Sequence, residues 1–112
     1  MTRHHRRGAA LEARTAAALG GRRVRRSRFE KVSDLEPLAL PSGAVIIVEC
    51  KSRATLPVLV SDALKQAREY GTAEMLPVAV LAAKGCAPVV CMTLADFIVA
   101  VGLPAKEAVD AS

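Results

Sequence analysis

The chain has 112 residues, a formal net charge of +5 and a hydrophobic content of 52%. This length suffices for one hydrophobic core and therefore for one domain, whereas the hydrophobic content is too high for a disordered chain. No apolar run approaches the roughly 20 residues needed to span a bilayer, and no continuous apolar segment follows the basic N-terminus. We therefore expect a globular protein without a membrane partner.

Basic side chains are concentrated at the start of the chain. Residues 1–31 contain ten Lys or Arg and two acids, a net charge of +8, whereas the remainder contains six basic and nine acidic residues, a net charge of −3. A polarised basic surface favours polyanions, because each neutralised phosphate releases condensed counterions. Aromatic residues make up only 3% of the chain, so we expect contacts with phosphates and duplex shape rather than base stacking. A solvated charged face is the alternative; the candidate DNA contacts are Arg6, Arg7, Arg22, Arg23, Arg25, Arg26 and Arg28.

The cysteines and histidines do not indicate a zinc site or a disulfide framework. Cys50, Cys86 and Cys91 are odd in number and lack CxxC spacing, so we expect reduced thiols. His4 and His5 lie among arginines without companion ligands. We interpret residues 1–7 as a basic flexible tail.

The first half of the chain predicts one helix followed by strands. Strong helix formers fill residues 8–19 and end at Gly20. Residues 22–29 fit an exposed strand or extended arm, and residues 34–40 fit a short strand interrupted by Pro37, which places it at an edge or in a bulge. The turn residues Pro41-Ser42-Gly43 follow.

The second half begins with the best strand in the sequence. Residues 44–48, AVIIV, form an unbroken β-branched run, which favours a central strand covered on both faces. Residues 57–70 have helical apolar spacing and stop at Gly71. Two apolar strands at 76–83 and 87–92 and a helix at 93–102 with Thr93 as N-cap complete the chain. The order αβββαββα predicts an α/β domain over residues 8–103, a mixed central sheet flanked by helices, and a C-terminal tail over 104–112.

Two carboxylates and one amine converge at the end of the central strand. Side chains alternate along a strand, so Glu49 and Lys51 share one face and Cys50 points to the other as an apolar filler. Asp34 lies at a similar distance from the turn at residue 42 on the opposite arm of the expected hairpin. Converging carboxylates repel one another unless a cation lies between them.

This combination matches the requirements of phosphodiester hydrolysis. Oxygen ligands from Asp34 and Glu49 would hold Mg²⁺ or Mn²⁺, the metal would polarise the phosphate and activate water, and Lys51 would orient the nucleophile and stabilise the developing charge. A Glu-x-Lys element alone is more often a solvated ion pair. Glu36, two residues from Asp34, is a rival carboxylate.

Asp34 followed by Glu49-x-Lys51 at the end of an apolar strand resembles the D…(D/E)xK signature of the PD-(D/E)xK nucleases. The short hairpin and single domain are similar to the archaeal and phage Holliday junction resolvases. This resemblance, which spans about residues 8–92, implies a restriction-endonuclease-like core. Ser33 stands where the motif has proline, and no recognition element is evident in the C-terminal part, so the preferred DNA structure is open.

The resemblance also assigns two further site elements. Gly8-x-x-x-Glu12 matches the helix that contributes a further metal-site Glu, although a Glu in a first helical turn also simply favours the helix dipole. Gln66 and Tyr70, four residues apart on one helix face, look like the QxxxY element of RecB-like members; helix surface is the alternative for both. The implied metal ligands are Asp34, Glu49 and Glu12, with Lys51 and Gln66 as the other catalytic residues.

The residue pattern predicts a Mg²⁺-dependent endonuclease acting on branched or duplex DNA. The resemblance implies a role in recombination, repair or phage DNA processing, in the cytoplasm of a bacterial cell or a phage-infected host. A homodimer is expected, because symmetric cutting of a four-way junction needs two sites related by a two-fold axis. The alternatives are a non-catalytic DNA-binding module that retains the nuclease fold, and a small protein-interaction domain whose arginines engage an acidic partner.

Overall fold

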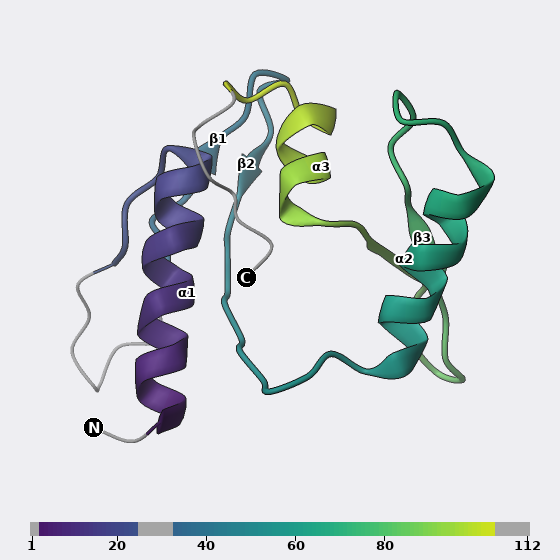
Figure 1. The fold of residues 1–112 in the computed structure, drawn as a ribbon. Helices are drawn as coiled ribbons and strands as arrows, with labels where there is room; N and C mark the ends of the chain where they lie inside the picture. The colour runs from purple at the N-terminus through teal and green to yellow at the C-terminus, as the bar shows by residue number, and fades with distance from the viewer. Residues whose placement is uncertain (1–2, 25–32, 105–112) are drawn as a thin grey trace.

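The computed structural model describes residues 3–24 and 33–104, with side chains from Gly8 onward. The described part is a small mixed α/β arrangement of three helices and two antiparallel two-stranded sheets (Figure 1). Its elements are α1 (Arg3–Leu19), β1 (Leu38–Ala39), β2 (Val45–Ile46), α2 (Val58–Tyr70), β3 (Ala79–Leu81), β4 (Val89–Cys91) and α3 (Leu94–Ala100). The predicted mixture of helices and strands is confirmed at this level.

Helix α1 begins five residues before the expected start at residue 8. The backbone of residues 3–7 therefore belongs to the helix. Arginine has good intrinsic helix propensity, which permits this extension although basic side chains are unfavourable near the positive end of the helix dipole. The C-terminal stop is confirmed: Gly20 has a φ of 73° and the Gly21 N–H donates to the Ala16 carbonyl at 2.9 Å.

The predicted hairpin between residues 34 and 50 is also confirmed. β1 and β2 pair antiparallel with Leu38 opposite Ile46. The turn closes through a hydrogen bond from the Gly43 N–H to the Leu40 carbonyl at 2.9 Å. Gly43 has a φ of 95°, a conformation that L-residues with a side chain rarely adopt, so glycine is required at this position.

The expectation of a central strand covered on both faces is wrong for this structure. Only Val45–Ile46 has strand geometry in this run, and it pairs with β1 alone. Val45 is 63% exposed and Ile47 is 75% exposed. A β-branched apolar run favours extended backbone whatever covers it, so the composition predicted the conformation but not the burial.

α2, β3 and β4 lie together, apart from α1 and the hairpin (Figure 1). α2 begins one residue after the predicted start at Pro57 and ends at Tyr70 as predicted, and β3 pairs antiparallel with β4. β2 and β3 belong to different sheets in the described part of the chain, so the expected strand-helix-strand crossover within one mixed sheet is not formed there. The predicted N-cap is confirmed, because the Thr93 hydroxyl accepts from the Asp96 N–H at 3.1 Å.

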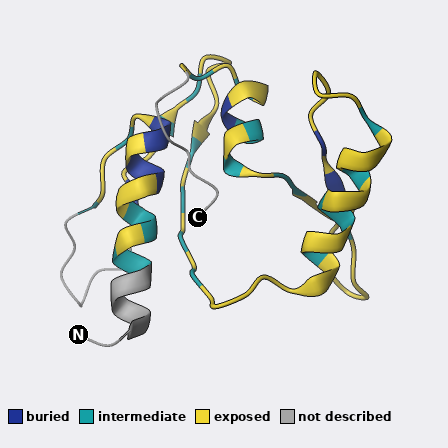
Figure 2. Ribbon diagram, in the orientation of Figure 1, coloured by how far each residue is buried: buried dark blue, intermediate teal, exposed yellow. Residues whose placement is uncertain are grey.

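The core lies where α1, the hairpin and α3 meet (Figures 1 and 2). Leu35 is fully buried there, against Ala16 and Leu19 of α1 and Ile98 of α3. By contrast, α2 contributes no buried residue to the described structure, and Figure 2 shows α2 and its surroundings mostly in the exposed colour. The hairpin end that carries the candidate site is therefore packed on the best-buried part of the molecule.

Candidate active site

Asp34 lies directly against the segment that carries Glu49. Outward from the Leu38–Ile46 pair the regular ladder ends, because the Leu35 N–H and the Asp34 N–H both donate to the Val48 carbonyl. The Asp34 N–H donates to the Val48 carbonyl at 3.1 Å, and the Cys50 N–H donates to Asp34 Oδ2 at 2.5 Å. Asp34 is only 4% exposed. The counting of residues from the turn thus placed Asp34 correctly beside the Glu49 segment.

Glu49 and Lys51 flank Cys50 and pair with each other. Lys51 Nζ lies 3.5 Å from Glu49 Oε2, and the two side chains are 77% and 53% exposed, respectively. This contact agrees with the predicted shared face of the two residues. An ion pair this exposed contributes little to stability, so both groups can leave it at little cost when another ligand is present.

Glu12 lies in the middle of α1, because the helix begins at Arg3. The first-turn dipole explanation for this carboxylate is therefore wrong. Its side chain is 17% exposed, and its Oε1 lies 3.7 Å from a guanidinium nitrogen of Arg23. Thr15, three residues further along the same helix face, is buried. Glu12 therefore faces the interior side of α1, toward the hairpin end.

The charges of all three predicted carboxylates act on the Cys50 thiol. Burial raises the pKa of this thiol above its usual range, a hydrogen bond with the Thr15 side chain lowers it, and the negative charges of Asp34, Glu12 and Glu49 raise it further. Cys50 is half-buried and packs against the core cluster, as its expected filler role requires. The structure thus brings all three predicted carboxylates within electrostatic reach of one side chain.

The donor chemistry of this set fits a hard divalent cation, which prefers carboxylate oxygens. The positions of the donors are not yet those of a metal centre: among the described residues, no three His, Cys, Asp or Glu side chains are grouped closely enough to hold an ion. Glu12 and Glu49 are instead each paired with a cationic side chain, Arg23 and Lys51. Mg²⁺ or Mn²⁺ binding would require these two acids to turn toward Asp34.

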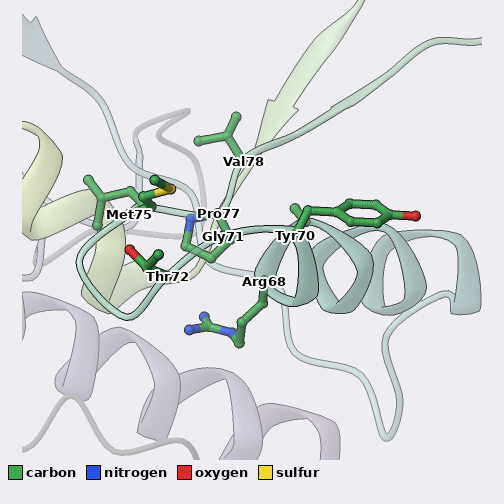
Figure 3. Close-up of a pocket in the computed structure, with 9 residues that line it drawn as sticks. Arg68, Tyr70, Gly71, Thr72, Met75, Pro77 and Val78 are labelled. Carbon is green, nitrogen blue, oxygen red and sulfur yellow. The ribbon is translucent and has the colours of Figure 1, made fainter.

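Gln66 and Tyr70 are not brought to this site. Both are exposed on α2, which lies away from α1 and the hairpin in Figure 1. Tyr70 is 88% exposed and borders a hollow of about 300 Å³ at the C-terminal end of α2. In Figure 3 its ring points away from the other labelled residues of that hollow, such as Thr72 and Met75.

The candidate phosphate-binding arginines are only partly described. Arg22 and Arg23 are exposed on the segment that follows α1, next to the Asp34 strand, since the Glu36 N–H donates to the Arg22 carbonyl at 2.8 Å. Glu36 itself is exposed, whereas Asp34 is buried, which favours Asp34 as the carboxylate of the site. The backbone of Arg6 and Arg7 belongs to α1, and Arg25, Arg26 and Arg28 lie outside the described residues.

Two contacts at the site were missed from the sequence. The hydrogen bond between Thr15 and Cys50 could have been suspected, because Thr15 follows Glu12 by three residues on a predicted helix. The ion pair between Glu12 and Arg23 could not, because it depends on how the chain reverses after Gly20 and Gly21.

Comparison with known proteins adds no relative to this picture. No protein-family model matches the chain, and neither a curated protein nor a solved structure is significantly similar to it. Within the described residues, no helix combines the length and the apolar character that crossing a membrane requires.

Proposed function

We propose that the protein is a metal-dependent endonuclease that hydrolyses DNA phosphodiesters, with Asp34, Glu49, Glu12 and Lys51 at its active site. The observation that carries the proposal is the hydrogen bond from the Cys50 N–H to Asp34 Oδ2 at 2.5 Å, which fixes one carboxylate against the backbone of the segment that carries Glu49 and Lys51. Their spacing in the sequence is that of the PD-(D/E)xK signature. The expected substrate is branched or duplex DNA, as for a Holliday junction resolvase.

Each residue of the site has a distinct chemical task in this proposal. The carboxylates of Asp34, Glu49 and Glu12 would hold Mg²⁺ or Mn²⁺, which when bound supplies Lewis acidity at the phosphate and a more acidic water. Asp34 is held in place by backbone hydrogen bonds, so it needs no reorganisation. Lys51, whose side chain is 77% exposed, can leave Glu49 and place its ammonium beside a phosphate oxygen, where it stabilises the charge that develops during hydrolysis.

The nuclease fold implied by the resemblance would join the two small sheets into one mixed sheet, with β2 next to β3 and α2 as the crossover. Isolated two-stranded sheets are marginally stable in water, and each sheet here leaves a large apolar side chain exposed: Val45 of β2 is 63% and Val80 of β3 is 66% exposed. Ile47, which directly follows β2, is 75% exposed. Joining the sheets would cover such residues. Disulfide formation between Ile47→Cys and Val80→Cys, in a chain without its native cysteines, tests this topology; the pair Ile47→Cys and Tyr70→Cys serves as the control.

Cleavage of labelled four-way junctions, flaps and plain duplex in Mg²⁺ tests the function. Lys51→Ala and Glu49→Ala should abolish cutting while DNA binding, followed by fluorescence anisotropy, changes little. Lys65→Ala and Glu69→Ala remove the same charges from exposed positions on α2 and should leave cutting intact. Binding of all three substrates by the folded protein without cleavage of any would overturn the proposal.

A non-catalytic DNA-binding module is the second candidate. It is favoured by the pairing of Glu12 with Arg23 and of Glu49 with Lys51, since paired acids need no metal. Both candidates predict affinity for DNA that falls steeply with salt, because phosphate contacts release counterions. Only the nuclease loses an activity on Lys51→Ala. The proposed homodimer is tested separately by sedimentation at micromolar concentration, where a pure monomer would exclude a resolvase.

A further inference from the structure

Arg23 is held by its backbone at the edge of the candidate site. It forms an antiparallel bridge with Leu35, and the adjacent Val24 N–H donates to the Asp34 carbonyl at 3.0 Å. The segment that carries Arg23 is therefore tied to the strand that carries Asp34. Its guanidinium reaches back to α1, where a nitrogen lies 3.7 Å from Glu12 Oε1.

Each side chain of the Arg23–Glu12 ion pair could also bind another ligand. The Glu12 side chain is 17% exposed, and its charge acts on Cys50 together with those of Asp34 and Glu49, so the positive charge of Arg23 offsets part of this negative charge. The Arg23 side chain is 46% exposed and remains open to solvent on its other side. A divalent cation would compete with Arg23 for Glu12, and a phosphate would compete with Glu12 for Arg23.

We infer that Arg23 is a latch that couples DNA binding to metal binding: a DNA phosphate draws the guanidinium away from Glu12, and the released carboxylate then accepts the cation. The inference rests on the proposed function and adds its regulation. The metal ligand Glu12 is neutralised by Arg23 while DNA is absent, so the complete ligand set forms only on the substrate. By thermodynamic linkage, the metal must increase DNA affinity by the same factor by which DNA increases metal affinity.

The first measurement is Mn²⁺ affinity of the free full-length chain, determined by electron paramagnetic resonance. Arg23→Gln should bind Mn²⁺ up to about fivefold more tightly than the unmodified chain, the factor that corresponds to loss of a partly exposed ion pair. Arg22→Gln is the matched control, because it removes the same charge from the neighbouring exposed position, and no ion pair of Arg22 occurs within the described part of the chain. In the Glu12→Gln background, Arg23→Gln should have no further effect.

The second measurement is the affinity for a labelled duplex with and without Mn²⁺ at constant ionic strength, in the Lys51→Ala background so that the DNA stays intact. Mn²⁺ should tighten DNA binding by up to about fivefold when Arg23 is present, and this gain should disappear in Arg23→Gln but not in Arg22→Gln. Equal effects of the two arginine variants would overturn the latch, because they would show that only the loss of one positive charge matters and not the contact with Glu12. Mn²⁺ binding that depends on Glu49 but not on Arg23 refutes the latch alone, whereas no Mn²⁺ binding by any variant refutes the proposed function as well.

Discussion

Substitutions of Asp34 separate its structural role from its chemical one. The buried Asp34 carboxylate accepts the Cys50 N–H at 2.5 Å, so Asp34→Ala leaves a partly buried donor without this acceptor. Hydrogen bonds to charged groups contribute about 1.5–3 kcal/mol. For a chain of this size, we expect a loss of about 2–3 kcal/mol in the free energy of unfolding and a decrease of roughly 8–12 °C in Tm.

Asp34→Asn retains an oxygen that can accept the same hydrogen bond but lacks the negative charge. We expect its free energy of unfolding to stay within about 1 kcal/mol of the unmodified chain, since neutral acceptors form weaker bonds than charged ones. Cleavage of DNA should nevertheless be lost, because a neutral amide oxygen binds a divalent cation more weakly than a charged carboxylate does. Stability and activity should therefore respond differently to the two substitutions.

Urea unfolding and differential scanning calorimetry measure these differences, with Glu36→Ala as the control. Glu36 is exposed and lies two residues from Asp34, so its removal should change stability by less than about 0.5 kcal/mol. An Asp34→Ala chain as stable as the Glu36→Ala chain would refute the anchoring role. Equal destabilisation by Asp34→Asn and Asp34→Ala would show that the charge, and not the hydrogen bond, stabilises this end of the hairpin.

Three further predictions concern the framework around the site. Because the pKa of the Cys50 thiol is raised in the folded chain, the folded state holds this proton more tightly than the unfolded state does. The free energy of unfolding should therefore fall as pH rises above about 8.5. Urea unfolding at pH 7.5 and 9.5 should show a smaller fall for Cys50→Ala than for the unmodified chain. Gly43→Ala should cost about 1 kcal/mol in the same assay, because a side chain at a φ of 95° is strained although nothing lies within 4 Å of the added Cβ. Thr93→Ala should cost about 1 kcal/mol through loss of the α3 cap and Thr93→Ser much less; equal losses would exclude the hydroxyl as the cause.

The sequence predicted the features of the fold that are determined by residues close together in the chain, such as helix ends and turns. The apolar spacing from Val58 to Tyr70 and the stop at Gly71 gave the bounds of α2, and Thr93 gave the start of α3. The position of the turn at Gly43 predicted the pairing of β1 with β2 to within one residue. It thereby placed Asp34 beside the segment that carries Glu49. Each of these features is determined by neighbouring residues in the chain, so it can be read without knowledge of tertiary contacts.

Features that depend on distant contacts were not predictable in the same way. The run at residues 44–48 indicates extended backbone, but the exposure of Ile47 depends on whether β3 lies beside it, some thirty residues further along the chain. The early start of α1 places Glu12 in mid-helix, and its pairing with Arg23 depends on the chain reversal after Gly20. The separation of Gln66 from the hairpin likewise follows from the placement of α2 as a whole.

The three acids of the candidate site differ in how firmly they are held, and this difference bears on how the site would assemble. Asp34 is buried and bonded to the backbone, whereas Glu49 and Glu12 are held by ion pairs of 3.5 and 3.7 Å whose cationic members are 77% and 46% exposed. Exposed pairs of this kind contribute only about 0.2–1 kcal/mol each. Ligands that gain more than this by binding can therefore displace Lys51 and Arg23 without disturbing the core. Under the proposed function, one fixed carboxylate with two releasable ones would give a site whose metal affinity depends on what the cationic side chains bind, and DNA phosphates are the proposed ligands of both.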